Sequence, residues 1–315
     1  MNGGTRKPAA RGLRVNRLAV LGVGLIGGSV ALALKQARVV RQVSGFGRTR
    51  RNLTHALRSG VIDEIADTPA QAVAGADLVL IATPVGQMPE LMKQIAPHLT
   101  PDAVVTDAGS TKQDVIACAR RHLARHLDRF VPGHPIAGAE KSGAAAAQPA
   151  LFRDHNVILT PDETTAAAAV RKVTALWRAT GATVVKMDAP AHDRLLALVS
   201  HLPHVLSYAL VDDVASRDDA RRIFGFAAGG FRDFTRIAGS SPEMWSDICV
   251  ANRDALLVEL GVYQEHLNNL RRLIKARDRG GLAEVFEQAR EARKKLLLKR
   301  ERRGVRSEEL RRTEQ

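Results

Sequence analysis

The sequence predicts an α/β fold in which a doubly wound parallel sheet is followed by an all-helical domain. Apolar runs of strand length alternate with helical segments of about 10–15 residues, and the first run ends in a glycine-rich turn; both features predict the sheet. The strand signal stops after Met187, where the pattern becomes helical. We therefore expect a basic tail at 1–16, the α/β domain at 17–187, a helical domain at 188–280 and a basic helical tail at 281–315.

The elements of the α/β domain follow in order along the chain. Strands are expected in "RLAVLG" (17–22), "QVSGFG" (42–47), "ADLVLIATP" (76–84), "PDAVVTDAGS" (101–110), "DRFV" (128–131), "HNVILTP" (155–161) and "GATVVKM" (181–187). Helices are expected in "IGGSVALALKQA" (26–37), "RRNLTHALRSG" (50–60), "TKQDVIACARRHLARHL" (111–127) and "DETTAAAAVRKVTALWRAT" (162–180). The near-continuous apolar run at 76–84 is typical of a strand that is buried on both faces.

The helical domain carries one long apolar seam. Its members recur at three- and four-residue steps: Trp245, Cys249, Asn252, Leu256, Leu260, Tyr263, Leu267, Leu270 and Ile274. A single helix of this length would extend beyond a small domain, so the seam predicts packing against a second copy of the chain, in a homodimer.

Composition limits the classes of partner. The net charge of +14 is concentrated at the ends, because residues 1–17 carry five basic and no acidic residues and residues 271–315 carry 16 basic against 8 acidic. Only 4% of residues are aromatic and no nucleic-acid-binding motif occurs, so specific nucleic-acid binding is not expected. No apolar run approaches the roughly 20 residues that span a bilayer, and the basic N-terminus lacks a hydrophobic signal region. Two widely spaced cysteines suit a reducing compartment, so we expect a cytoplasmic protein with no membrane association.

The turn "GVGLIGG" after the first strand has the spacing of a dinucleotide-binding fingerprint. Gly22, Gly24 and Gly27 would allow a tight turn, close approach of the backbone to a pyrophosphate, and packing of helix on sheet. The same motif outside a strand–turn–helix context would be weak evidence. Here the context is that of a Rossmann domain, which predicts dinucleotide binding.

The end of the second strand bears on which cofactor is bound. An acidic residue there usually binds the ribose 2′-hydroxyl, but this chain has Gly47 followed by Arg48, Thr49, Arg50 and Arg51. A guanidinium at this place favours a 2′-phosphate, so NADP is predicted over NAD, with NAD use still open. The alternative is an ordinary solvated basic start of a helix.

The loop "VPGHPIAGAEKSG" (131–143) places His134 at the carboxyl edge of the sheet, where ligands of open α/β folds bind. Imidazole titrates near neutrality and can accept a proton from a substrate hydroxyl while hydride leaves the same carbon. Ser110, in "TDAGSTK" (106–112), precedes a helix and is either an N-cap or a residue that faces the nicotinamide, and both roles are compatible.

Two segments of the helical half carry candidate binding residues. His201 and His204 in "SHLPH" lie three apart on one face, and without a carboxylate at ligand spacing they argue against a metal site. Arg232 and Arg236 in "GGFRDFTRIAGSSPEMW" suit an anionic substrate, because arginine binds carboxylates through two hydrogen bonds. A solvated helix end is the alternative.

Taken together, "GVGLIGGS", "DAGSTK", "GHPIAGAEKSG", "HDRLLALVSHLPH" and "GGFRDFTRIAGSSPEMW" resemble the prephenate/arogenate dehydrogenase family of tyrosine biosynthesis, over roughly residues 17–280. The resemblance implies oxidative decarboxylation of prephenate or arogenate by a Rossmann domain joined to a helical dimerisation domain. It implies that His134 is the catalytic histidine, that Ser110 orients the substrate hydroxyl and the nicotinamide, and that Arg236 binds a substrate carboxylate. His204, Glu140 and Trp245 correspond to residues that line the pocket. The cofactor-binding set that we expect is Gly22, Gly24, Leu25, Ile26, Gly27, Arg48, Thr49, Thr83, Pro84 and Ser110.

Two departures from the family pattern matter. Many members have an acidic residue where Gly47 stands, which leaves the cofactor preference open, and the basic tail after about residue 280 is too short for the regulatory domains of some relatives. A β-hydroxyacid dehydrogenase is a rival, although such enzymes place a catalytic lysine where "HDRLLALVSHLPH" has none. A redox sensor that binds NADP without turnover is a second rival. The sequence does not distinguish prephenate from arogenate.

Overall fold

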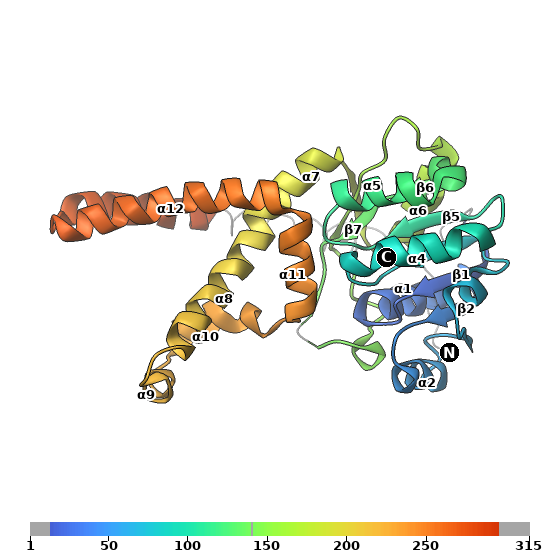
Figure 1. The fold of residues 1–315 in the computed structure, drawn as a ribbon, viewed down its shortest axis with the longest axis horizontal. Helices are drawn as coiled ribbons and strands as arrows, with labels where there is room; N and C mark the ends of the chain where they lie inside the picture. The colour runs from blue at the N-terminus through green and yellow to red at the C-terminus, as the bar shows by residue number, and fades with distance from the viewer. Residues whose placement is uncertain (1–12, 140, 296–315) are drawn as a thin grey trace, which may run out of the picture. The chain divides into compact units, whose positions relative to one another are not determined.

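The computed structural model describes residues 13–139 and 141–295, which form two units that divide between Leu256 and Leu257 (Figure 1). The first unit contains both the sheet and most of the expected helical region. The predicted fold class, an α/β domain with a parallel sheet followed by helices, is confirmed. The domain boundaries expected from the sequence remain predictions.

The main sheet has six parallel strands in the order β3-β2-β1-β4-β5-β6. The strands are β1 (Val15–Leu21), β2 (Val40–Phe46), β3 (Glu64–Ile65), β4 (Leu78–Ile81), β5 (Val104–Asp107) and β6 (Phe130–Val131). Every residue of β4 is buried, as its continuous apolar run predicted. Every residue of β5 is buried as well, including the polar Thr106 and Asp107. The strand order reverses between β1 and β4, and such a switch point opens a crevice at the carboxyl ends of these two strands.

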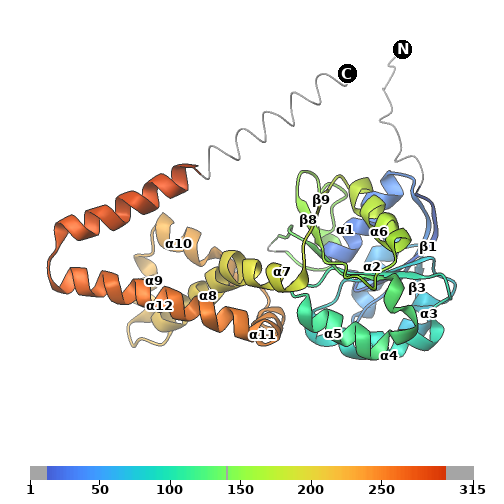
Figure 2. The ribbon, with the colours of Figure 1, turned by 90° about the horizontal axis from the view of Figure 1, so that it is seen from above.

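Helices cover both faces of this sheet (Figure 2). One face packs against α1 (Leu25–Gln36), α2 (Arg50–Arg58) and α6 (Ala167–Ala179) around the fully buried Trp177. The other face packs against α3 (Pro69–Val73), α4 (Met88–Ile95) and α5 (Gln113–His122) around Met88 and Met92. Two hydrophobic cores on opposite faces hold the strand ends in fixed positions.

The strands after β6 form a second sheet, which the sequence did not predict. Strands β7 (Gly133–Pro135), β8 (Asn156–Leu159) and β9 (Thr183–Lys186) pair in the order β7-β8-β9, with β7 antiparallel to β8. The segment around His134, expected as a loop, is therefore a short edge strand, a position that tolerates Pro135 because no neighbour needs its missing N–H.

A continuous helical stretch of 27 residues, Ala189–Ala215, begins the helical region and comprises α7 (Ala189–Leu196), a π-helical turn at Ala197–His201 and α8 (Leu202–Ala215). By length and hydropathy it could span a membrane, which corrects the expectation that no run approaches that length. Its buried face carries His192, Asp193 and His201, whereas Leu198 and Val199 are 50% and 60% exposed. Several apolar side chains of this stretch therefore face outward although polar ones are buried, an arrangement that suits a subunit interface.

The seam expected in one long helix is divided between two helices. After α9 (Ala220–Gly225), α10 (Gly229–Thr235) and a 3₁₀ turn at Arg236–Gly239, helix α11 (Pro242–Ala251) ends at Asn252, and α12 (Arg253–Lys275) follows. Asn252 leaves the helical conformation because its buried amide donates to the carbonyl of Asp193. Trp245 and Ile248 of α11 pack into the core beneath α4 and α5.

The second unit contains the rest of α12 and a helical segment at 279–295. Asp278 closes the turn between them by accepting a hydrogen bond from the N–H of Gly281 (2.9 Å), and Leu273 is buried at this turn.

Candidate active site

The glycine-rich turn has the geometry of a dinucleotide site. Gly22 has φ +101°, and a Cβ there would lie 2.5 Å from the carbonyl oxygen of Ala82, so no other residue fits. A Cβ on Gly27 would lie 2.3 Å from the oxygen of Gly22. Gly24, the N-cap of α1, has no side-chain cap, and a Cβ on it would meet nothing within 4 Å. The free N–H groups at this helix end are a ready site for a pyrophosphate.

The other expected cofactor residues flank this turn. Leu25 and Ile26 form the first turn of α1, and Thr83 and Pro84 follow β4, the strand beside β1. The hydroxyl of Thr83 is buried without a hydrogen-bond partner, which leaves a polar group free for a ligand beside the glycines. These residues therefore fit a dinucleotide.

Arg48 and Thr49 lie where the sequence placed them, after β2, but Arg48 is already paired. Its guanidinium binds Glu243 of α11 through two hydrogen bonds (2.7 and 3.2 Å), and Gln87 donates to the same carboxylate (3.1 Å). The Arg48 side chain is 65% exposed, so this pair is open to exchange with solvent or another anion. Thr49 is the N-cap residue of α2 and makes no side-chain cap bond.

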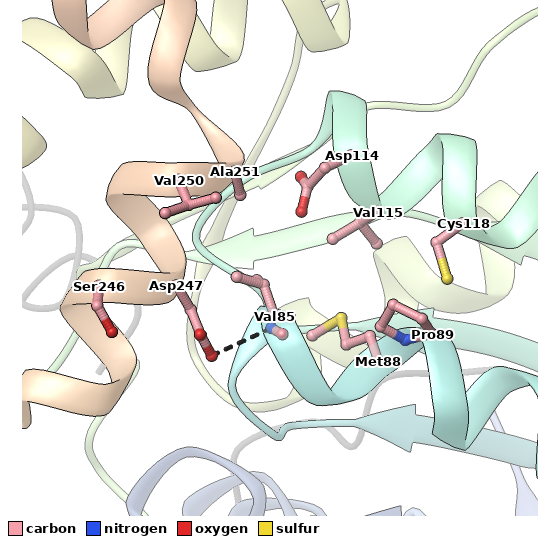
Figure 3. A pocket seen from close by; sticks show the side chains of 11 residues that line it. Val85, Met88, Pro89, Asp114, Val115, Cys118, Ser246, Asp247, Val250 and Ala251 are labelled. Carbon is pink, nitrogen blue, oxygen red and sulfur yellow. Dashed lines mark hydrogen bonds between the residues drawn. The ribbon is translucent and has the colours of Figure 1, made fainter.

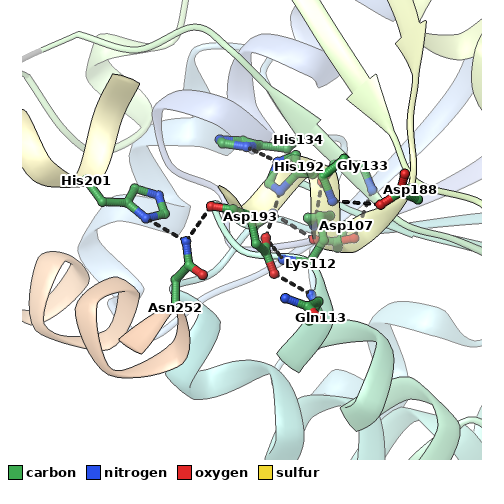
Figure 4. A network of polar contacts seen from close by, with 12 residues as sticks. Asp107, Lys112, Gln113, Gly133, His134, Asp188, His192, Asp193, His201 and Asn252 are labelled. Atoms are coloured by element: carbon green, nitrogen blue, oxygen red, sulfur yellow. Dashed lines mark hydrogen bonds and ion pairs between the residues drawn. The ribbon is translucent and has the colours of Figure 1, made fainter. Parts of the chain in front are cut away.

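His134 lies at the carboxyl ends of β5 and β6 and is buried. Its Nδ1 lies 2.8 Å from Nε2 of His192, whose own Nδ1 lies 2.8 Å from a carboxylate oxygen of Asp193 (Figure 4). Burial, followed by His192, Lys112 and His201, lowers the pKa of His134 well below its usual value. At neutral pH the imidazole is therefore uncharged and able to accept a proton.

The buried side chain of Asp107 fixes the two segments that carry Ser110 and His134. It accepts hydrogen bonds from the N–H of Gly109 (2.8 Å) and the N–H of Gly133 (3.0 Å). Lys112, which is fully buried, forms an ion pair with the same carboxylate and donates to the carbonyl of Gly133 (2.8 Å). A buried lysine is tolerated only with such partners, so the network holds the peptide preceding His134 in one place.

Ser110 is not the N-cap of α5, which corrects one of its two expected roles. Helix α5 begins at Gln113 with Lys112 as its N-cap residue. The carboxylate of Asp193, from α7, accepts hydrogen bonds from the N–H groups of Lys112 and Gln113 (both 2.9 Å) and thus performs the capping. Ser110 is half-buried in the turn between β5 and α5, at the edge of the sheet where the ligand of a doubly wound fold binds.

The expected substrate residues of the helical half come together around Trp245. The ring of His204 stacks on Trp245 with 3.6 Å between centroids, and His201 meets the same ring edge-on at 6.1 Å. Burial, opposed by the bond to the carbonyl of Ser200 and aided by the charge of Arg236, lowers the pKa of His204. The exposed Arg236, at the start of the 3₁₀ turn, therefore lies near His204. Glu140 lies outside the described residues.

A cavity of about 340 Å³ lies apart from these residues, between α4, α5 and α11 (Figure 3). None of the expected site residues lines it; its lining is Val85, Gly86, Met88, Pro89, Asp114, Val115, Cys118, Ser246, Asp247, Val250 and Ala251. Burial raises the pKa of the Cys118 thiol to about 11, so the thiol is protonated at neutral pH.

Asp107, Lys112, His192, Asp193 and Asn252 were missed by the sequence analysis as site residues. Four of them stand in segments that drew attention for other residues, "TDAGSTK" and "HDRLLALVSHLPH". The available signal was a charged residue inside an otherwise apolar or glycine-rich segment, but the sequence does not reveal that these charges are buried. Among the described residues, no group of three or more His, Cys, Asp or Glu side chains could hold a metal ion.

Comparison with known proteins identifies relatives along most of the chain. Residues 30–186 match the family model for the nucleotide-binding domain of prephenate dehydrogenase, and residues 188–288 match the model for its dimerization domain. The chain is 39% identical over 280 residues to a cyclohexadienyl dehydrogenase of Zymomonas mobilis, which covers 88% of this chain and 94% of that relative. It is 38% identical to a prephenate dehydrogenase of Bacillus subtilis, with 88% of this chain and 75% of the relative covered.

Solved structures agree with the sequence matches. A prephenate dehydrogenase from A. aeolicus in complex with hydroxyphenyl propionate and NAD+ superimposes with a TM-score of 0.84 at 32% identity, covering 91% of this chain and 100% of the other. An arogenate dehydrogenase from Synechocystis gives a TM-score of 0.73 at 29% identity, with 89% and 99% covered. The nucleotide-binding match identifies a nicotinamide cofactor, and the dimerization match supports a homodimer that acts on a small molecule.

Proposed function

This chain belongs to the prephenate dehydrogenase family, and we propose that it catalyses the oxidative decarboxylation of prephenate or arogenate in tyrosine biosynthesis, with NADP as the favoured cofactor. The observation that carries the proposal is His134: a buried, neutral imidazole at the carboxyl edge of a dinucleotide-binding sheet. Prephenate would yield 4-hydroxyphenylpyruvate, and arogenate would yield tyrosine. Relatives that carry either name are similar to this chain, so both substrates are kept.

The cofactor would be held by the first βα turn. The N–H groups at the start of α1 would bind the pyrophosphate, Gly24 would leave room for it, and the Thr83 hydroxyl would offer a hydrogen bond. When bound, the nicotinamide supplies the acceptor for the hydride that leaves C4 of the substrate ring.

His134 accepts the proton of the ring 4-hydroxyl as the carbon–hydrogen bond at C4 breaks. The resulting ketone draws the electrons of the breaking C–CO2 bond into the ring, which becomes aromatic as CO2 departs. The ring oxygen then regains the proton from His134 as a phenol. The general base contributes about 10²–10⁴-fold to such a step.

Ser110 would orient the hydroxyl and the nicotinamide, because it lies in the turn that Asp107 and Asp193 hold in place. Arg236 would bind a substrate carboxylate through its guanidinium, with His204 and Trp245 lining the pocket beside it. Glu140 is retained as a lining residue from the sequence resemblance alone.

The preference for NADP is proposed from the end of β2. Gly47 provides no carboxylate to accept from a ribose hydroxyl, and a Cβ there would have its nearest contact at 3.5 Å, so the chain has room for an acid but lacks one. Arg48 stands next to it and can exchange Glu243 for a 2′-phosphate. NAD remains a possible cofactor, as in the relative that was solved with NAD+.

We also propose that the homodimer uses the outward apolar side chains of α7 and of the π-helical turn that follows it. We further propose that the enzyme is cytoplasmic and binds neither a membrane nor a specific nucleic acid. Leu195, Leu198 and Val199 are 43%, 50% and 60% exposed, and pairing with a second copy would cover them. The proposed domains are the Rossmann domain at 17–187 and the helical domain at 188–280, with basic tails on either side.

The test is a set of initial rates for the purified chain with prephenate and arogenate, each with NADP and with NAD. Formation of reduced cofactor together with 4-hydroxyphenylpyruvate or tyrosine supports the proposal. Tight NADP binding without turnover of either substrate would favour the redox sensor instead, and turnover of a β-hydroxyacid alone would favour that class of dehydrogenase.

A further inference from the structure

Two buried side chains, Asp193 and His192, form a hydrogen-bonded series that ends at His134. His192 is 0% exposed and Asp193 is 1% exposed, and both belong to α7. Figure 4 shows the two links, from Asp193 to His192 and from His192 to His134, each 2.8 Å long. His192 has no role in the reaction proposed above, although it is the hydrogen-bond partner of the imidazole of His134.

The charge of Asp193 determines which atom donates and which accepts in the two hydrogen bonds that connect Asp193, His192 and His134. Although burial raises it, the pKa of Asp193 is lowered on balance by hydrogen bonds from His192 and from the N–H groups of Gln113 and Lys112. An ionised carboxylate only accepts, so Nδ1 of His192 must carry a hydrogen and donate it. Burial also lowers the pKa of His192, which is therefore neutral with an unprotonated Nε2.

The tautomer of His192 in turn determines the tautomer of His134. Because Nε2 of His192 can only accept, Nδ1 of His134 must carry the hydrogen and donate across the 2.8 Å link. A neutral imidazole has one N–H, so the remaining lone pair of His134 lies on Nε2. This is the opposite of the tautomer that free histidine favours in water.

We propose that His192 and Asp193 are positioning residues for the oxidation step, which hold His134 with its proton on Nδ1 and leave Nε2 as the base for the substrate hydroxyl. The proposal deepens the function proposed above and rests on it. During turnover Nε2 of His134 takes the hydroxyl proton, and the Nδ1–H bond to His192 then stabilises the imidazolium. Asp193 does not itself take up a proton; it orients His192 and offsets the charge.

The anchoring of Asp193 explains why this geometry is fixed. Its carboxylate accepts from the first N–H groups of α5, and its backbone carbonyl accepts from Asn252 (2.8 Å), so α5 and the end of α11 both hold this residue of α7. The turn that carries Ser110 leads directly into the capped end of α5. One carboxylate thus places both the serine and the histidine of the proposed reaction.

The tautomer can be observed without substrate or cofactor. In the dimeric, full-length enzyme labelled with 15N-histidine, the signals of His134 are those that disappear in His134→Asn. We expect a protonated Nδ1 and an unprotonated Nε2 at neutral pH in the wild type. In His192→Phe the acceptor is gone, and the proton of His134 should move to Nε2. A wild-type His134 that carries its proton on Nε2 would overturn the proposal.

Kinetics separate positioning from a merely structural role. His192→Phe should lower kcat by about 10²-fold with KM changed by less than about twofold, because the wrong tautomer affects the chemical step. His192→Gln offers an amide oxygen to Nδ1 of His134 and should recover at least tenfold of that loss. Equal losses in both variants, with parallel changes in KM and Tm, would mean that His192 only fills space.

His126→Phe is the matched control, since His126 is also a buried histidine but lies outside the site, in the 3₁₀ turn Ala124–Arg129 that follows the C-terminal end of α5. It should keep the wild-type kcat and leave the His134 signals unchanged. The charged and titratable groups that act on His134 are His192 of α7, Lys112 at the N-cap of α5 and His201 of the π-helical turn. Asp193 and Asp107 act in turn on His192. If the wild type turns over neither prephenate nor arogenate while the expected tautomer is present, the proposed function fails and the positioning geometry stands.

Discussion

Two polar clusters of the first unit differ in how firmly they are held. Around His134, the residues Asp107, Lys112, His192 and Asp193 are at most 1% exposed, and each side chain is bound by two or more partners. Beside Gly47, by contrast, Arg48 and Glu243 are 65% and 52% exposed and form a single surface pair with help from Gln87. Buried, multiply bonded groups keep one geometry, whereas exposed pairs exchange easily.

The difference matches the two tasks that we propose for the site. Proton transfer requires an imidazole fixed to within a fraction of an ångström, so the catalytic side is built from buried charges that carry a desolvation penalty. Choice between NAD and NADP requires only one more contact with a phosphate, so an exposed arginine is sufficient. Mutations in the buried cluster around His134 should therefore change stability and kcat. Mutations of the Arg48–Glu243 pair should change the selectivity between NADP and NAD.

The largest effect is expected from Lys112→Met. Removing the ammonium leaves the buried carboxylate of Asp107 without its counter-charge, so the free energy of unfolding should fall by about 3–5 kcal/mol in urea titrations. Lys172→Met is the control: Lys172 is half-buried and binds only the carbonyl of Asp77 (2.8 Å), so its loss should cost about 1 kcal/mol. Equal losses in the two variants would show that the Lys112–Asp107 pair is no more constrained than an ordinary hydrogen bond.

Arg236→Ala should have a smaller effect, which acts on substrate binding. Loss of a charge-assisted contact of about 1.5–3 kcal/mol should raise KM for the substrate by about tenfold or more, with a smaller change in kcat. Steady-state kinetics with saturating cofactor measure both constants. A fall in kcat at unchanged KM would exchange the roles assigned to Arg236 and His134.

The fold and the residue types of the site follow from the sequence, because strand runs, the glycine turn and "GHP" have local signatures. The partners of these residues do not. Asp107, Lys112 and Asp193 are charged residues whose burial depends on three elements meeting at one point, which no local pattern encodes. The expected N-cap role of Ser110 was wrong for this reason: a carboxylate 83 positions later in the chain takes that role. Likewise, the apolar periodicity from Trp245 to Ile274 predicted one long helix, but the structure has two helices that are separated at Asn252.

Gly47→Asp combined with Arg48→Ala tests whether the exposed Arg48 determines the preference for NADP. Wild-type kcat/KM should be about tenfold or more higher with NADP than with NAD, since one charge-assisted contact is made with NADP only. The double change should invert that preference, because the new carboxylate accepts from the ribose hydroxyl and repels a phosphate. Equal wild-type efficiency with both cofactors would exclude the NADP preference and leave the dehydrogenase assignment intact.

Glu243→Gln should have the smallest effect. It removes the anion that competes with a 2′-phosphate for Arg48, so kcat/KM for NADP should rise by about two- to fivefold while that for NAD stays constant. The gain should shrink at high salt, because exposed charges are screened. Asp67→Asn, which removes the partner of the neighbouring Arg50, is the control and should change neither value. A gain with both cofactors alike would mean that Glu243 acts on α11 and not on the phosphate.

The pH dependence of kcat/KM in the wild type and in His134→Ala tests the central claim, that a neutral His134 accepts the substrate proton. The base must be unprotonated, and burial sets its pKa well below the ordinary 6.5, so activity should be constant near neutrality and fall as the pH drops through a value below 6.5. His134→Ala should lose about 10²–10⁴-fold in kcat, with little change in KM, and should lack that acid limb. An acid limb that survives in His134→Ala, or one centred above pH 7 in the wild type, would contradict the account.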